Sequence, residues 1–158
     1  MICSTCSNPL RSNAKFCDQC GKPLKVMNSM KKKASNKLTV LIIDDDPTYR
    51  DAYSFKFKKE GFDVILARNG KEGLESARTE NPSVILLDIL MPDMSGLDVL
   101  RELKEDTKTK RVPVVLATIL NEKADIERGL ALGAEHYITK DEMTADDVVA
   151  RVRSAAMN

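Results

Sequence analysis

The stretch LTVLIIDDDP, residues 38–47, decides the fold of most of this chain. It begins with an almost continuous apolar run and ends in Asp44, Asp45 and Asp46 before a proline. Apolar runs of this length are typical of strands buried on both faces, as in a parallel sheet. Because proline is favoured at the first position of a helix, Asp46 is predicted to cap a helix that begins at Pro47.

The same alternation continues to the end of the chain. Four more short apolar runs follow, at residues 64–67, 84–87, 112–117 and 137–139. Patterns with helical spacing occupy residues 47–59, 71–80, 97–104, 123–132 and 145–156. Glycines punctuate them as predicted caps or turns, at Gly61, Gly70, Gly96 and Gly133. Residues 38–158 are therefore predicted to form a doubly wound α/β fold with a five-stranded parallel sheet.

Polar residues follow four of the five predicted strands. Asp44 and Asp45 follow the first, Asp88 the third, Thr118 the fourth and Lys140 the fifth. Since open α/β sheets bind ligands at the carboxyl ends of their strands, these side chains are expected to meet at one edge. Each residue alone has a plainer interpretation, as a turn former, a strand residue or a solvated lysine. It is much less plausible that all four strand ends carry such residues by accident, so we interpret them as one site.

Clustered carboxylates repel one another unless a cation neutralises them. Mg²⁺, which prefers oxygen ligands and retains water, fits such a cluster best and supports phosphoryl transfer. The predicted chemistry is attack by a carboxylate, which gives an aspartyl phosphate. A lysine ammonium and a threonine hydroxyl would contact the phosphoryl group.

Residues 38–158 resemble the receiver domain of two-component response regulators, a flavodoxin-like fold. The motifs that carry the resemblance are LTVLIIDDDP, VILLDILMPDMSGLDVL, PVVLAT and GAEHYITK. By this resemblance Asp88 is the phosphoacceptor, and the protein accepts a phosphoryl group from a sensor histidine kinase or a phosphotransfer protein. The resemblance also implies a Mg²⁺ site in which Asp45 and Asp88 are ligands, Asp44 assists through water, and the backbone carbonyl of Leu90 completes the protein ligands.

The resemblance assigns a switching role to three further residues. Thr118 and Lys140 contact the phosphoryl group, and Tyr137 changes rotamer when the threonine moves. Two positions depart from the family pattern, because a small residue usually stands at Ile119 and a proline at Asp141. We expect the bulky isoleucine to narrow access to the acceptor and the extra carboxylate to alter the turn after the lysine.

All four cysteines lie in the first 20 residues, as two C-x2-C pairs: Cys3, Cys6, Cys17 and Cys20. Two such pairs can offer four thiolates to one structural Zn²⁺. Two disulfides are one alternative, but disulfides are rare in cytosolic proteins. A redox-active cysteine pair is the other, but such a pair usually lies in a βαβ unit, whose sequence pattern this segment does not have. The segment 1–24 resembles the short zinc-ribbon modules of many bacterial and archaeal proteins. Residues 25–37 are predicted to form a flexible basic linker.

Charge separates the two parts of the chain. Residues 1–37 contain eight Lys or Arg and one Asp, whereas the rest contains 17 basic and 23 acidic residues. The basic segment favours a contact with protein, including the acidic receiver itself, or with nucleic acid, although Phe16 is its only aromatic residue. The chain has no apolar run of the ~20 residues that span a bilayer and no apolar signal segment, so we expect a cytoplasmic protein without membrane insertion.

Two classes of function therefore remain. The first is a phosphorelay response regulator without a separate C-terminal output domain, which switches protein binding and acts on no substrate other than its own acceptor. The alternative is a nucleic-acid-binding regulator that uses the ribbon and linker as its output.

Overall fold

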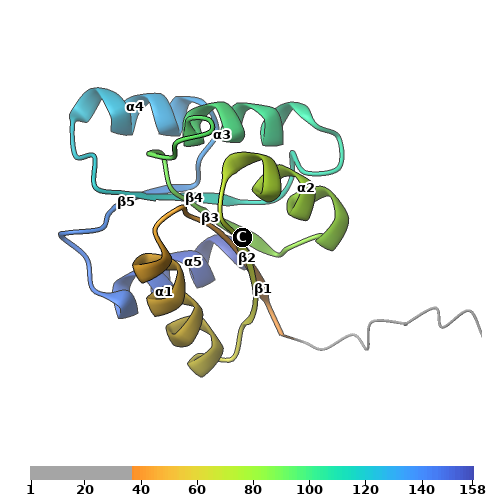
Figure 1. The fold of residues 1–158 in the computed structure, drawn as a ribbon, viewed down its shortest axis with the longest axis vertical. Coiled ribbons are helices and arrows are strands. Elements are labelled where there is room, and N and C mark those ends of the chain that lie inside the picture. The colour runs from red at the N-terminus through yellow and green to blue at the C-terminus, as the bar shows by residue number, and fades with distance from the viewer. Residues whose placement is uncertain (1–36) are drawn as a thin grey trace, which may run out of the picture. The chain divides into compact units, whose positions relative to one another are not determined.

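The computed structural model describes residues 37–158, which form a three-layered α/β unit. A five-stranded parallel sheet lies between α2, α3 and α4 on one face and α1 and α5 on the other (Figure 1). The strands are β1 (Thr39–Ile43), β2 (Asp63–Ala67), β3 (Val84–Leu87), β4 (Val114–Thr118) and β5 (His136–Thr139). The helices are α1 (Pro47–Lys59), α2 (Gly70–Glu80), α3 (Gly96–Glu105), α4 (Lys123–Ala131) and α5 (Ala145–Ala156). The strand order β2-β1-β3-β4-β5 confirms the predicted doubly wound fold.

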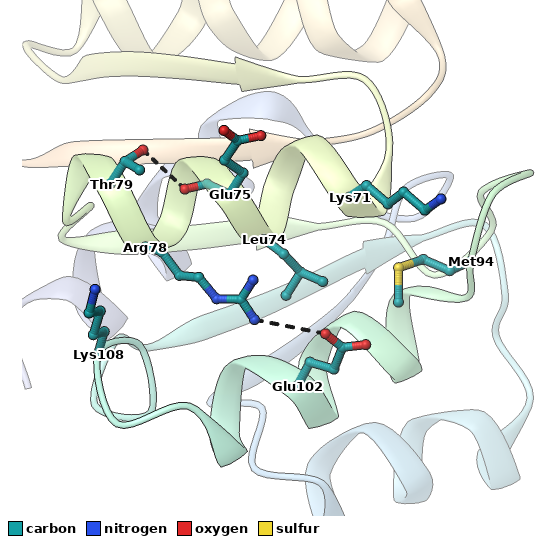
Figure 2. A pocket seen from close by; sticks show the side chains of 8 residues that line it. All are labelled: Lys71, Leu74, Glu75, Arg78, Thr79, Met94, Glu102 and Lys108. Carbon is teal, nitrogen blue, oxygen red and sulfur yellow. Dashed lines mark hydrogen bonds and ion pairs between the residues drawn. The ribbon is translucent and has the colours of Figure 1, made fainter.

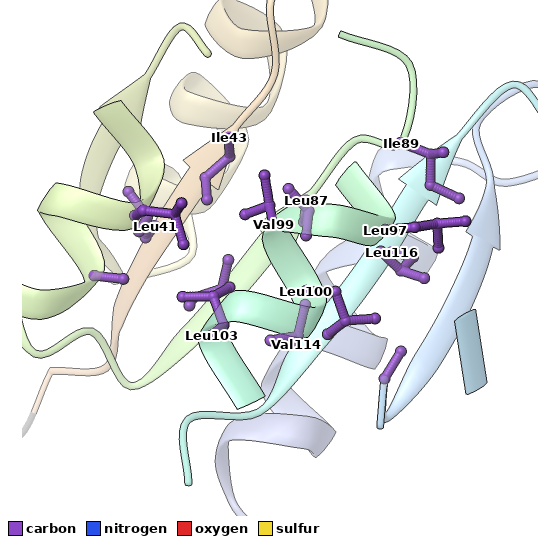
Figure 3. Packing of buried hydrophobic residues seen from close by; sticks show 14 of the residues in the cluster. Leu41, Ile43, Leu87, Ile89, Leu97, Val99, Leu100, Leu103, Val114 and Leu116 are labelled. Carbon is purple, nitrogen blue, oxygen red and sulfur yellow. The ribbon is translucent and has the colours of Figure 1, made fainter. Parts of the chain in front are cut away.

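Alternate residues of each strand feed two separate cores, as the period of two along a strand requires. Leu41 and Ile43 of β1 pack with α2 and α3, where Val99, Leu100 and Leu103 have no exposed surface (Figure 3). Val40 and Ile42 point to the opposite face, toward α1 and α5. Because both faces are covered by helices, the central strands β1, β3 and β4 are almost continuously apolar, which is the pattern that the sequence displayed.

Several local predictions were wrong. The fourth strand begins at Val114 and not at Val112, because Val112 donates its N–H to Thr109 in a turn and Pro113 has no N–H to donate. Gly70 and Gly96 are the first residues of α2 and α3 and not caps. Glycine is required at position 96 because the backbone packs closely there, and a Cβ would lie 2.0 Å from the carbonyl oxygen of Asp88.

Other turn predictions are confirmed. Asp46 caps α1, accepting the N–H of Thr48 at 2.8 Å. Gly61 and Gly133 adopt φ values of 89° and 102°, which favour glycine. Among the described residues, no helix is long and apolar enough to cross a membrane. The predicted ribbon, with its four cysteines, and the linker up to residue 36 lie outside the described residues.

Candidate functional site

Backbone hydrogen bonds carry the sheet one residue past β1, β3 and β5. The N–H of Asp88 donates to the carbonyl of Ile43 at 2.9 Å, and the N–H of Lys140 donates to the carbonyl of Thr118 at 2.9 Å. Asp44 makes a similar bond to Ala67 at 3.2 Å. The predicted site residues therefore follow adjacent strands on the carboxyl edge of the sheet, in the order β1-β3-β4-β5.

Three carboxylates gather at this edge. Asp44, Asp45 and Asp88 each place an oxygen within 4.8 Å of the others. Asp44 and Asp88 are buried, at 3% and 7% exposure, whereas Asp45 is exposed. The backbone N–H of Leu90 donates to Asp88 at 3.3 Å, which draws the following loop to the cluster. An all-oxygen set that is open on one side suits a hard divalent cation that keeps part of its water.

Lys140 lies between the two buried carboxylates. Its Nζ is 2.6 Å from Asp44 and 3.4 Å from Asp88, and the residue is only 8% exposed. Burial raises the pKa of the Asp88 carboxyl above its usual range, and the Asp44 charge adds to this rise, while the lysine opposes it. Asp88 is thus a desolvated carboxylate that is held beside a positive charge, as a carboxylate nucleophile requires.

The two predicted switch residues on the other side both bind Leu120. The fully buried Thr118 accepts the N–H of Leu120 at 3.4 Å, and the Tyr137 hydroxyl donates to its carbonyl at 2.9 Å. Burial raises the pKa of Tyr137 to about 12, with smaller contributions from the charges of Asp125 and Asp88. The segment after β4 is therefore tethered through the threonine and the tyrosine together.

The two departures from the family pattern lie at the surface. Ile119 is 49% exposed, and Asp141 is also exposed. Their effects on access to Asp88 and on the turn remain predictions.

Three residues that support the site were missed by the sequence analysis. Arg50 of α1 donates to the backbone carbonyls of Asp44 and Asp45 at 2.9 and 3.0 Å, which fixes the acidic loop. Tyr49, also on α1, places its ring 4.0 Å below the Nζ of Lys140. The sequence offered only helical spacing for Tyr49, because the contact joins segments that are 91 positions apart.

The third missed residue is Asp93, which lies in the loop that follows Asp88. Its carboxylate accepts the N–H groups of Gly70 and Lys71, both at 3.2 Å. These bonds hold its pKa below the usual range despite the opposing effect of desolvation. The loop that follows Asp88 is therefore anchored to the start of α2.

A groove of about 830 Å³ lies elsewhere, between α2 and α3 (Figure 2). Leu74 and Met94 line it, and Arg78 reaches across toward Glu102 at 3.9 Å. Because it lacks the clustered carboxylates, its chemistry differs from that of the acidic edge.

Comparison with known proteins assigns the described unit to a family. Residues 40–153 match the response regulator receiver domain, so the chain belongs to this family. Residues 2–24 match a zinc-ribbon domain. The chain is 38% identical over 101 residues to the protein PilH of Pseudomonas aeruginosa, covering 64% of this chain and 84% of PilH.

Longer relatives and solved structures agree. The chain is 34% identical over 125 residues to the probable transcriptional regulatory protein TcrX of Mycobacterium tuberculosis, covering 79% of this chain. The chain spans about half the length of TcrX, at 52%. The Francisella response regulator 1452 receiver domain is 30% identical with a TM-score of 0.71, covering 77% of this chain and 98% of that one. The BeF3-activated N-terminal receiver domain of Klebsiella pneumoniae RstA is 27% identical with a TM-score of 0.70, covering 76% and 99%.

Proposed function

We propose that this response regulator accepts a phosphoryl group on Asp88 in a Mg²⁺-dependent reaction and thereby switches its binding to another protein. One observation carries the proposal: Asp44, Asp45 and Asp88 meet within 4.8 Å while Lys140 contacts the two buried members. Three carboxylates with one lysine leave an excess of negative charge, which a divalent cation would offset.

The donor is the phosphohistidine of a sensor histidine kinase or a phosphotransfer protein. A carboxylate oxygen of Asp88 attacks phosphorus, and the bond between phosphorus and the imidazole nitrogen breaks. The imidazole keeps the electron pair and takes a proton from water. In hydrolysis, water attacks the same phosphorus, the Asp88 carboxylate leaves with its electron pair, and inorganic phosphate is released. The protein acts on its own acceptor only, so it is not an enzyme in the usual sense.

The donor set fits Mg²⁺. Asp45 and Asp88 would bind it directly, Asp44 would act through water, and the Leu90 carbonyl would be the further protein ligand. When bound, the ion supplies positive charge against the phosphoryl oxygens. Arg50 would keep the two loop aspartates in place through their backbone carbonyls.

Thr118 and Tyr137 would carry the signal away from the acceptor. The Thr118 hydroxyl accepts the N–H of Leu120, and the Tyr137 hydroxyl donates to the carbonyl of Leu120. If Thr118 moved to donate its O–H to a phosphoryl oxygen, the first of these two tethers would be lengthened. Release of the segment before α4 would then change the surface around β4, α4 and β5. Such a ligand-driven exchange between two arrangements is a population shift.

The N-terminal ribbon would hold one structural Zn²⁺ through Cys3, Cys6, Cys17 and Cys20, a closed thiolate set without a catalytic position. The match to a zinc-ribbon domain over residues 2–24 supports this. Metal analysis of purified protein should find about one zinc per chain, and a value well below one would contradict the site.

Phosphate-affinity electrophoresis tests the acceptor. Acetyl phosphate with Mg²⁺ should slow the migration of the wild-type chain, and chelation of Mg²⁺ should abolish the effect. Asp88→Asn should show no retarded band, while Asp141→Asn, a matched change beside the site, should retain it. A retarded band in Asp88→Asn would refute the assignment.

A further inference from the structure

We propose that Tyr49 is a positioning residue for Lys140, because its aromatic face holds the lysine ammonium against Asp44 and Asp88. This role rests on the proposed phosphoacceptor function of Asp88. The Nζ of Lys140 lies 4.0 Å from the centroid of the Tyr49 ring. A cation within about 6 Å of an aromatic face is attracted by the ring, and the attraction grows when the cation is desolvated.

The lysine needs such a partner because it has little contact with water. Its side chain is only 2% exposed, and its flexible stem does not by itself fix the ammonium. Asp44 attracts the ammonium at 2.6 Å and Asp88 at 3.4 Å. The Tyr49 ring adds an uncharged wall that attracts the cation without competing for the metal. Two carboxylates and one ring thus surround the ammonium.

Tyr49 is itself held in place. It lies in the first turn of α1, and its ring stacks on that of Tyr53 at a centroid distance of 6.1 Å and an angle of 25°. Tyr53 is 6% exposed and belongs to the core between α1, α5 and the sheet. The buried second tyrosine restricts the first, so the wall is part of the folded core and not a mobile surface group.

The contact places the positive charge before the phosphoryl group arrives. Preorganised charges lower a barrier because they need no rearrangement at the moment of reaction. If the ring were removed, water would reach the ammonium and it would adopt more orientations. The maximal rate of phosphorylation should then fall, while binding of the donor and of Mg²⁺ should change little.

Three full-length variants test this role with acetyl phosphate at saturating Mg²⁺. We expect Tyr49→Leu to lower the maximal rate about tenfold, in keeping with a desolvated cation–π contact. The acetyl phosphate concentration that gives half the maximal rate should stay within about twofold, because the donor does not bind the ring. Tyr49→Phe keeps the aromatic face and should restore most of the rate. Phe55→Leu removes an aromatic group from the same helix at a position that is 72% exposed, and should match the wild type.

A spectroscopic measurement separates this proposal from the proposed function. In NMR spectra recorded without any donor, ring currents should shift the ε-methylene signals of Lys140 in the wild type and in Tyr49→Phe, but not in Tyr49→Leu. If the wild type takes up no phosphate but shows the shift, the proposed function fails and the placement of the lysine stands. An unshifted wild-type signal, an unchanged rate in Tyr49→Leu, or an equal loss of rate in Tyr49→Phe would overturn the role of the ring.

Discussion

Helices α4 and α5 pack near the same edge strand, β5, on opposite faces of the sheet, but they are anchored differently (Figure 1). In α5, Thr144 and Asp147 form a reciprocal capping box, and four residues are buried: Val148, Val149, Val152 and Ala155. In α4, the N-cap Glu122 makes no side-chain hydrogen bond, and Gly129 is the only buried residue of the helix. Helices with few buried contacts have low local stability, so α4 should open at a lower free energy than α5.

The two helices lie on the two sides of the candidate site, and the residues of the site also differ between these sides. Lys140 is buried against the ring of Tyr49, which is partly buried on the side where α1 and α5 pack. Thr118 and Tyr137 meet at Leu120, in the segment that leads into α4. The side on which α5 is capped and buried would hold the reacting groups in place, and the weakly anchored α4 would respond to them.

The largest expected effect is a difference in the free energy of unfolding between a variant in the core under α1 and a variant on the surface of α4. Phe57→Ala removes a fully buried ring and should lower the free energy of unfolding by about 3–5 kcal/mol. Leu130→Ala on α4, where the side chain is 46% exposed, should cost no more than about 0.5 kcal/mol. Urea denaturation measures both. Similar losses in the two variants would break the comparison.

A second test acts on the one buried position of α4. A Cβ at Gly129 would lie 2.4 Å from Cδ1 of Leu116 and 3.4 Å from the Tyr137 ring. Gly129→Ala should therefore displace α4, at a cost of about 1–3 kcal/mol for overpacking that the better helix propensity of alanine offsets by about 1 kcal/mol. Hydrogen exchange should become faster in α4 and remain unchanged in α5.

The matched control for that test is Arg128→Ala, an exposed position on the same helix. It should leave the hydrogen-exchange rates of α4 close to those of the wild type, since its side chain is exposed. If both variants accelerate exchange equally, the helix responds to any substitution and not to displacement from the sheet.

A third test compares the two helix caps directly. Thr144→Ala removes the hydroxyl that accepts the N–H of Asp147 at 3.2 Å and should cost about 1 kcal/mol. Glu122→Ala changes the equivalent position of α4, where no side-chain bond is lost, and should be nearly neutral. Thermal unfolding of the two variants measures the difference, and an equal shift in both would show that the caps do not distinguish the helices.

The smallest expected effect is the pH dependence of the α5 cap. Hydrogen bonds from the Thr144 hydroxyl and backbone N–H hold the pKa of Asp147 below its usual value. A depressed pKa in the folded state stabilises the fold above the unfolded value of about 3.9, and this stability is lost as the pH falls through the lowered pKa. The stability difference between wild type and Thr144→Ala should therefore narrow on acidification, as urea titrations at several pH values would show. A difference that widens in acid would contradict the capping role.

Much of the fold followed from the sequence because its apolar runs are short, continuous and separated by helical patterns. The expected spans of α1, α5 and β3 agree with the observed Pro47–Lys59, Ala145–Ala156 and Val84–Leu87. The first strand was placed one residue early, as it begins at Thr39. The start of β4 failed because a turn bond from Val112 and the missing N–H of Pro113 override their apolar character.

The site followed from the sequence only in part. Its charged members stood out because each follows a strand, and parallel strands bring their carboxyl ends to one edge. Arg50 and Asp93 did not stand out, because a backbone carbonyl or N–H that serves as a partner leaves no mark in the sequence.

The sequence by itself determined the order of strands and helices along the chain and the acidic residues at the strand ends. It also indicated the family to which the described unit belongs. It did so because local hydrophobic periodicity and strand-end chemistry can be read along the chain. Only the tertiary structure decided that Lys140 lies between Asp44 and Asp88 on the face of Tyr49, and that Thr118 and Tyr137 both bind Leu120. Apart from the local bond between Thr118 and Leu120, these contacts join segments that are distant in sequence, and their distances depend on how the helices pack on the sheet.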